Sequence, residues 1–144
     1  MKNFTSKDFG NTASTLQVEL PERLIHRDVE GSGEDARFSR ERKHLVQVVD
    51  LPSKTISVTL GGLEPGQLTS RHRHTYETIL YVLEGQGETT IEDRVVKWKA
   101  GDAVYIPVWA WHSHRSTTTT PSRYLACENA PMVQNLGVAL REEA

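Results

Sequence analysis

The alternation of hydrophobic and polar residues predicts a chain built mainly from β-strands. Ile56, Val58 and Leu60 alternate with Ser and Thr, which is the period of a half-buried strand. Residues 78–83 are apolar at successive positions and predict a strand buried on both faces. Two alternating runs on either side of Asp93 predict a hairpin. Further strands are expected at 45–49, 69–74, 104–107, 112–116 and 123–128.

Turn-forming residues separate these short strands. Glycine and proline cluster at 61–66, and a further turn falls at 100–102. Short strands divided in this way are typical of a closed antiparallel barrel or jelly roll, so we expect an all-β fold. The chain is divided into an N-terminal arm and irregular segment with one helical turn at 1–44, the barrel at 45–130, and a C-terminal tail that packs on the outside or on a neighbour at 131–144.

Composition narrows the range of partners. The 144 residues hold 17 Lys and Arg against 19 Asp and Glu, a net charge of −2, which argues against nucleic acid and anionic membranes. The longest mostly apolar run, 103–111, has nine residues and is too short to span a bilayer. Residues 1–11 lack the apolar core of a secretory signal. Cys127 is the single cysteine, so no intrachain disulfide forms and a cytoplasmic location is expected.

The N-terminal arm bears on assembly. Residues 1–19 are polar and rich in Thr, Ser and Asn, with too few apolar side chains to fold alone. We therefore expect a homodimer in which residues from the first 45 cross to the partner.

Two pairs of histidines carry the candidate chemistry. His72 and His74 are two residues apart, and so are His112 and His114. Alternate residues of a strand project from the same face, about 6–7 Å apart. Two such imidazoles can lean toward one metal ion, and a third from a neighbouring strand would leave coordination positions open. This arrangement suits a catalytic metal better than a structural one.

The segment around the first pair resembles the cupins, a family of small β-barrels that often bind metal. The first cupin motif has a Gly, five residues and His-x-His, followed by a Glu and by a Gly that ends the strand. Here five residues separate Gly66 from His72-Arg73-His74, and Glu77 and Gly85 follow. The resemblance implies a cupin double-stranded β-helix with an N-terminal arm.

The second cupin motif follows in the correct order. It has a Gly, five residues, Pro-x-Gly, two residues and His, and here Gly101, Pro107 and His112 keep that spacing, with Trp109 in place of the Gly. The segments 72–75 and 107–114 are similar to those of gentisate 1,2-dioxygenases, which cleave aromatic rings with Fe(II) held by three His. The resemblance implies His72, His74 and His112 as ligands of one divalent metal ion, with Fe(II) favoured and Zn, Ni, Mn and Cu still open.

Two further residues are candidates for catalysis. Glu77 lies one place before the usual cupin Glu ligand, and one place on a strand means the opposite face. A bond from Glu77 to a ligand imidazole is therefore favoured over direct metal ligation. His114 shares a face with His112 and is either a buried hydrogen-bonded residue or an acid/base group.

The remaining residues near the motifs are expected to be structural. Tyr81, Trp109 and Trp111 are expected in the barrel core or at its mouth. Arg71, Arg73 and Arg115 lie out of phase with the histidines and are expected to face solvent or a subunit interface.

Three functions compete for this site. The favoured one is a non-haem Fe(II) dioxygenase acting on a small aromatic or other oxygen-chelating substrate, because three neutral imidazoles leave the full charge on the ion. The alternatives are a non-redox isomerase or lyase on a sugar acid, favoured by a carboxylate ligand, and a non-catalytic small-ligand-binding cupin, favoured by a pocket that Trp109 and Tyr81 close.

Overall fold

The strands expected from the sequence are present and form two antiparallel sheets. The computed structural model describes residues 5, 7, 9–10, 17–31 and 36–144. Within these ranges the elements are α1 (Ala36–Arg42), β1 (Leu45–Val48), β2 (Ser57–Leu63), β3 (His72–His74), β4 (Thr78–Glu84), β5 (Gln86–Ile91), β6 (Arg94–Lys99), β7 (Ala103–Ile106), β8 (His112–Ser116), β9 (Ser122–Glu128), α2 (Ala130–Asn135) and β10 (Arg141–Glu143).

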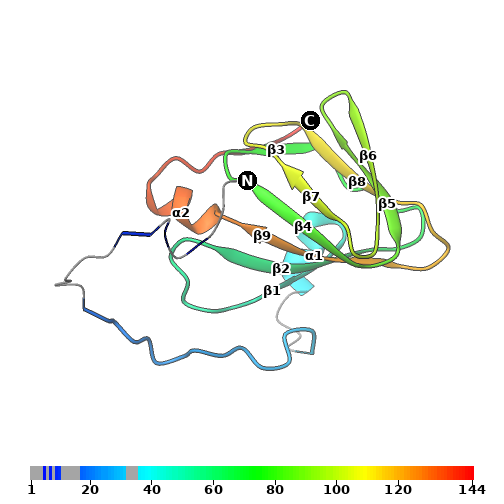
Figure 1. Cartoon of the computed structure of the whole chain (residues 1–144). Helices are drawn as coiled ribbons and strands as arrows, with labels where there is room; N and C mark the ends of the chain where they lie inside the picture. The colour runs from blue at the N-terminus through cyan, green and yellow to red at the C-terminus, as the bar shows by residue number, and fades with distance from the viewer. Residues whose placement is uncertain (1–4, 6, 8, 11–16, 32–35) are drawn as a thin grey trace.

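The two sheets have the layered arrangement of a jelly roll. One sheet has the order β1-β2-β9-β4-β7 and the other β10-β3-β8-β5-β6, and all neighbouring strands are antiparallel. The chain crosses from one sheet to the other several times, so strands distant in the sequence lie side by side (Figure 1). The all-β jelly-roll prediction is confirmed.

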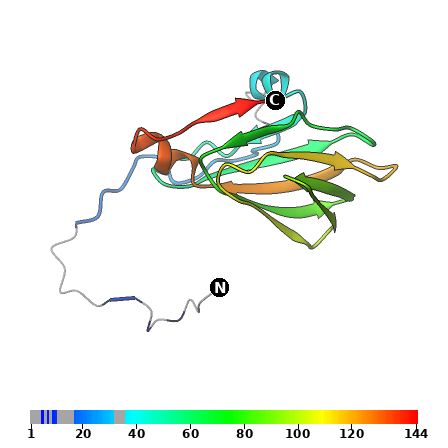
Figure 2. The same cartoon turned by 90° about the horizontal axis from the view of Figure 1, so that it is seen from above.

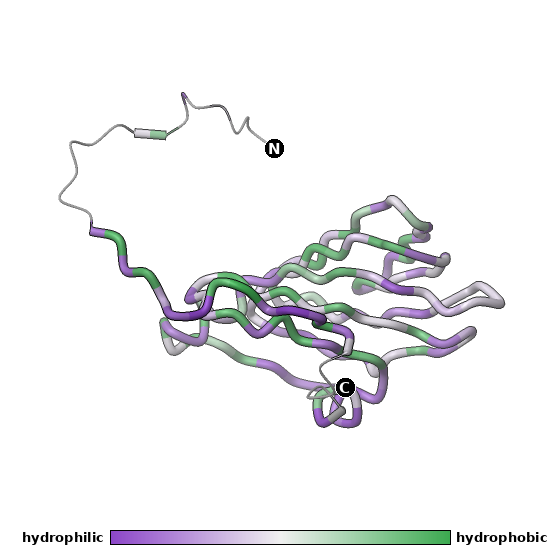
Figure 3. Tube along the Cα trace, turned by 90° about the horizontal axis from the view of Figure 1, so that it is seen from below, coloured by the Kyte–Doolittle hydropathy of each residue, from purple (hydrophilic) through white to green (hydrophobic). Residues whose placement is uncertain are grey.

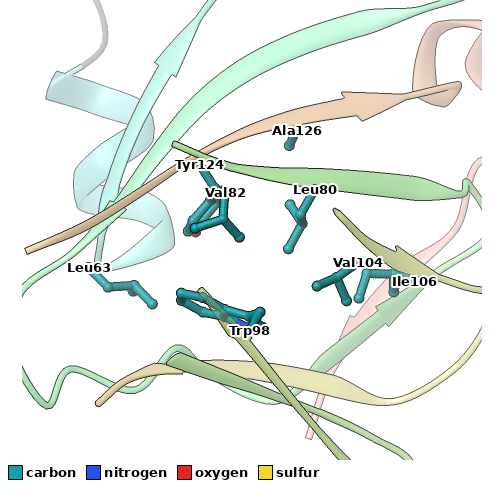
Figure 4. Packing of buried hydrophobic residues seen from close by; sticks show 8 residues of the cluster. All are labelled: Leu63, Leu80, Val82, Trp98, Val104, Ile106, Tyr124 and Ala126. Carbon is teal, nitrogen blue, oxygen red and sulfur yellow. The ribbon is translucent and has the colours of Figure 1, made fainter. Parts of the chain in front are cut away.

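The hydrophobic core fills the space between the sheets. Figure 4 shows the side chains of eight buried residues converging between the layers. Most come from the sheet that contains β4, and Trp98 on β6 supplies the large group from the opposite sheet. The Trp98 indole N–H donates to the hydroxyl of Thr89, which is fully buried, so this polar pair is satisfied within the core. The eight residues are Leu63, Leu80, Val82, Trp98, Val104, Ile106, Tyr124 and Ala126.

Strand β4 differs from its predicted burial. The apolar run was expected to be buried on both faces, but only Thr78, Leu80 and Val82 point inward. The side chains of Ile79 and Tyr81 are 53% and 48% exposed on the outer face of the sheet. The prediction was wrong because both faces of β4 carry apolar residues while only one faces the opposite sheet. An apolar outer surface remains.

The ends of the chain lie against the barrel differently. The segment 17–31 contacts the first sheet through an Arg23–Asp50 ion pair just after β1 and a Glu30–Arg123 ion pair on β9. The Gln47 side chain on β1 also donates to the Glu30 carbonyl, and hydrophobic positions recur along the segment (Figure 3). The C-terminal segment was expected on the outside or on a neighbour. It returns as β10 and pairs with β3, and Figure 2 shows it in red beside the sheet.

No helix within the described ranges is long and apolar enough to cross a bilayer.

Gly87 on β5 lies close against its neighbours and provides a test of the packing. A Cβ added at Gly87 would overlap the Trp98 ring and the backbone carbonyl of Arg115. We expect Gly87→Ala to lower the free energy of unfolding by about 1–3 kcal/mol, because rigid neighbours leave no room for the methyl group. Denaturant unfolding measures the change, with Gln86→Ala at an exposed position of the same strand as the control. Equal stability of the two variants would contradict this packing.

Candidate metal centre

The antiparallel pairing of β3 with β8 brings three histidines together. His72 lies directly opposite His112 in the register, and His74 is on the same face as His72. The ring centroids of His72 and His112 are 4.3 Å apart, and those of His74 and His112 are 4.8 Å apart. One ligand nitrogen from each ring lies within 4.8 Å of the other two. Among the described residues, this group of potential metal ligands contains no carboxylate.

Each of the three imidazoles is anchored to a backbone carbonyl through Nδ1. The His72 Nδ1 is 3.0 Å from the oxygen of Ser70, and the His74 Nδ1 is 2.7 Å from that of Tyr76. The His112 Nδ1 is 2.9 Å from the Ala110 oxygen. Because a carbonyl only accepts hydrogen bonds, each Nδ1 carries the proton and each Nε2 keeps its lone pair.

The electrostatic environment keeps these rings neutral. Burial is the largest cause that lowers the pKa of His72, to about 3, and the charge of protonated His112 lowers it further. Burial also lowers the pKa of His74, to about 4, and that of His112. At neutral pH the three Nε2 lone pairs are therefore free, which is the state that binds a divalent cation.

His114 lies beside this group at the end of a chain of hydrogen bonds. Its Nδ1 is 2.9 Å from the hydroxyl of Thr89, which already accepts from the Trp98 indole. The hydroxyl can donate to the His114 Nδ1 or accept from it, and the first arrangement places the imidazole proton on Nε2. Burial holds the pKa of His114 well below its usual value. The His114 ring is 5.6 Å from that of His112 and lines the same cavity.

The structure does not bring Glu77 into this group. Its carboxylate accepts a hydrogen bond of 2.6 Å from the Tyr105 hydroxyl, and its backbone N–H donates to Asn129 Oδ1. The Glu77 side chain is exposed and does not line the cavity around the histidines. The expected bond from Glu77 to a ligand imidazole is thus absent, because the Tyr105 hydroxyl holds the carboxylate on the exposed side.

A cavity of about 180 Å³ opens in front of the histidines. Apolar residues of the core, among them Leu80 and Ile106, form part of its wall. Three charged residues that sequence reasoning did not select also line it: Arg42 from α1, Glu128 from β9 and Arg141 from β10.

The pairing of distant strands brings to this cavity the residues that the sequence analysis did not select. Glu128 accepts a hydrogen bond from the Thr78 hydroxyl at 3.2 Å, and burial raises the pKa of its carboxyl. The sequence held one signal for Glu128. It lies two and four residues after Ala126 and Tyr124, which point inward, so it is on the same face of the strand. The positions of Arg42 and Arg141 depend on α1 and β10, whose packing no local pattern encodes. His44, to which the sequence gave no role, also lines the cavity.

The aromatic residues expected in the core or at the mouth lie elsewhere. Tyr81 is on the outer face of β4. Trp109 and Trp111 pack against the Arg73 guanidinium, at 4.3 and 4.4 Å from the ring centroids. None of these three side chains lines the cavity, so they do not close it.

Comparison with known proteins agrees with this architecture. The family model described as "Cupin domain" matches residues 59–128. The 5-aminosalicylate 1,2-dioxygenase of a Comamonas species is 31% identical over 90 residues, which are 62% of this chain and 24% of that enzyme. The gentisate 1,2-dioxygenase of a Streptomyces species is 29% identical over 89 residues, 61% of this chain and 25% of its own length. The matched region thus spans about a quarter of these curated relatives.

Solved structures show the same fold. The salicylate 1,2-dioxygenase from Pseudaminobacter salicylatoxidans superimposes with a TM-score of 0.68 at 22% identity, over 75% of this chain and 36% of that one. An uncharacterised protein with a double-stranded β-helix domain from Klebsiella pneumoniae gives 0.59 at 22% identity, over 70% of this chain and 84% of its own. Residues 59–128 of this chain therefore match the cupin domain, and the chain is similar in sequence to gentisate 1,2-dioxygenases.

Proposed function

We propose that this protein is an Fe(II)-dependent dioxygenase that acts on a small aromatic carboxylate. The observation that carries the proposal is the set of three neutral imidazoles whose Nε2 atoms face one another without a carboxylate among them. Points no more than 4.8 Å apart lie within about 2.8 Å of a common centre, so small side-chain movements reach the 2.0–2.1 Å of a metal–imidazole bond. His72, His74 and His112 would hold the ion.

The donor set fits a redox-active ion with open positions. Three facial protein ligands leave room for substrate oxygens and dioxygen, and Fe(II) would supply the activation of dioxygen toward the substrate. Because the imidazoles are neutral, they leave the charge of the ion undiminished. An anionic molecule that chelates through two oxygens is therefore the preferred ligand.

The cavity supports a substrate of this chemistry. Arg42 and Arg141 line it with positive charge that can pair with a carboxylate. Its volume of about 180 Å³ exceeds the roughly 150 Å³ of an apolar protein cavity that accommodates benzene. The relatives are named for 5-aminosalicylate and gentisate, which are aromatic rings bearing a carboxylate.

His114 has a defined role in this proposal. With the Thr89 hydroxyl donating to its Nδ1, His114 would carry its proton on Nε2 and offer a donor to the cavity that it lines. A neutral donor in a buried site stabilises negative charge that develops on a substrate oxygen. Glu77 takes no part, because the Tyr105 hydroxyl holds its carboxylate outside the cavity.

Removing one ligand tests the metal site. We expect His74→Ala to weaken Fe(II) and Zn(II) binding by more than the roughly 10–100-fold that loss of an outer partner costs, because only two imidazoles remain. Glu77→Gln is the matched control and should keep its metal. Metal analysis after anaerobic loading and gel filtration measures both variants. Full occupancy in His74→Ala would reject the proposed ligand set.

Exchange of the metal tests the reaction. With Fe(II), hydroxybenzoates bearing a carboxylate should be consumed in step with dioxygen. With Zn(II), which has no redox chemistry, turnover should cease. Oxygen uptake and product absorbance give the two readouts. Equal turnover with Zn(II) under argon would overturn the dioxygenase and identify a non-redox isomerase or lyase.

We also propose that the protein is a homodimer that works in the cytoplasm. Support for the dimer comes from apolar side chains left exposed on the N-terminal segment, where Val18 is 83% and Leu20 77% exposed, and on the outer face of β4 at Ile79 and Tyr81. The cytoplasmic location remains a prediction from the single Cys127.

Light scattering at micromolar concentration tests the assembly. We expect twice the chain mass of 16.2 kDa, and a shift toward monomer in Leu20→Asp, because a buried carboxylate would oppose burial of this surface. Glu22→Asp is the control in the same segment. A monomeric wild-type protein would contradict the homodimer.

A further inference from the structure

The outer face of β3 carries a cluster that lies directly behind the histidines. The Arg73 guanidinium is 4.3 Å from the centroid of the Trp109 ring and 4.4 Å from that of Trp111. The same guanidinium forms an ion pair with the Glu142 carboxylate. We call Arg73, Trp109, Trp111 and Glu142 the outer clamp.

The register shows which strands the outer clamp joins. Arg73 pairs with Glu142 across the β3–β10 ladder. Because His72 is opposite His112, the antiparallel register places Arg73 across from Trp111, just before β8. The clamp therefore joins β10, β3 and the segment that leads into β8. The inner faces of β3 and β8 carry the three histidines, and β10 carries Arg141 into the cavity.

Backbone pairing with β8 is uneven along β3. Before β3 it is regular, since Leu68 bridges Arg115 and the Thr69 N–H donates to the His114 carbonyl. The last ladder pair within the described residues is His72 with His112, so the ladder does not extend to Arg73 and His74. Trp109 adds one backbone bond, since its N–H donates to the carbonyl of His74 at 2.8 Å. Trp109 has a φ of +63°, a left-handed conformation that side chains rarely adopt without tertiary support. Packing on Arg73 supplies such support.

We propose that Arg73 is a positioning residue that fixes the two strands of the metal site relative to each other through the outer clamp. It touches neither the ion nor the substrate. A planar guanidinium between two indoles resists sliding of β8 along β3, and the ion pair to Glu142 ties β10 to the same point. The spacing between His112 and the pair His72 and His74 depends on this contact.

This inference rests on the proposed metal site. Cobalt binding tests the positioning role of Arg73 separately from the existence of that site. The full-length chain is loaded with Co(II), whose visible absorption reports the coordination geometry. Release of Co(II) to an excess of chelator gives a rate. Arg73→Met removes the charge and the planar group, and Arg73→Lys keeps the charge. Arg115→Met makes the same change at an exposed position of β8.

We expect Arg73→Met to release Co(II) about tenfold faster or more, with an altered visible spectrum, as for loss of an outer-shell partner. Arg73→Lys should recover part of the difference, and Arg115→Met should match the wild type. General destabilisation alone would leave the spectrum of the bound ion unchanged. Wild-type release and spectrum in Arg73→Met would overturn this proposal and leave the proposed function intact.

Two further outcomes complete the test. If Arg73→Met does not fold, Glu142→Gln is measured instead, and faster release is expected because the ion pair is lost. Unchanged release in that variant overturns the proposal. Failure of the wild-type chain to bind Co(II) or Fe(II) would overturn both the metal site and the role of Arg73.

Discussion

The three hydrogen bonds from histidine Nδ1 atoms to backbone carbonyls are the constraint on which the site depends. A buried imidazole that lacked such a partner would carry an unsatisfied donor, which costs about 1–3 kcal/mol. Here Ser70, Tyr76 and Ala110 supply the acceptors, each two residues from the histidine that it anchors. The same bonds fix the tautomer and the ring orientation. The lone pairs therefore converge before any ligand arrives, and binding requires little reorganisation.

The three histidines lie between the two sheets, and residues of the hydrophobic core form part of the wall around them. Leu80, Ile106, Tyr124 and Ala126 belong to the core and also line the cavity. They supply low-polarity walls that lower the pKa values of the histidines by burial. The cavity is thus part of the core packing, and its apolar wall is what keeps the imidazoles neutral at physiological pH.

Local patterns in the sequence predicted the features that depend on strand periodicity. The spacing of two residues placed His72 and His74 on one face, and the resemblance to the cupin motifs added His112 as the third ligand. The same reasoning failed at β4, where apolar residues at successive positions do not reveal which face meets the other sheet. Parity alone did not place Glu128 beside the histidines, and nothing local placed Arg141 there, because both positions depend on strands paired across long sequence distances.

The flanking elements have a separate part in the chemistry. The three histidines and Glu128 lie within residues 59–128, the region that matches the cupin domain. Arg42 and Arg141, which bring positive charge to the cavity, come from α1 and β10 outside that region. A barrel of this kind can therefore keep one metal site while the segments around it set the charge and shape of the cavity. Selection among carboxylate substrates would then reside in α1 and β10, whereas the capacity to bind the proposed ion would reside in β3 and β8.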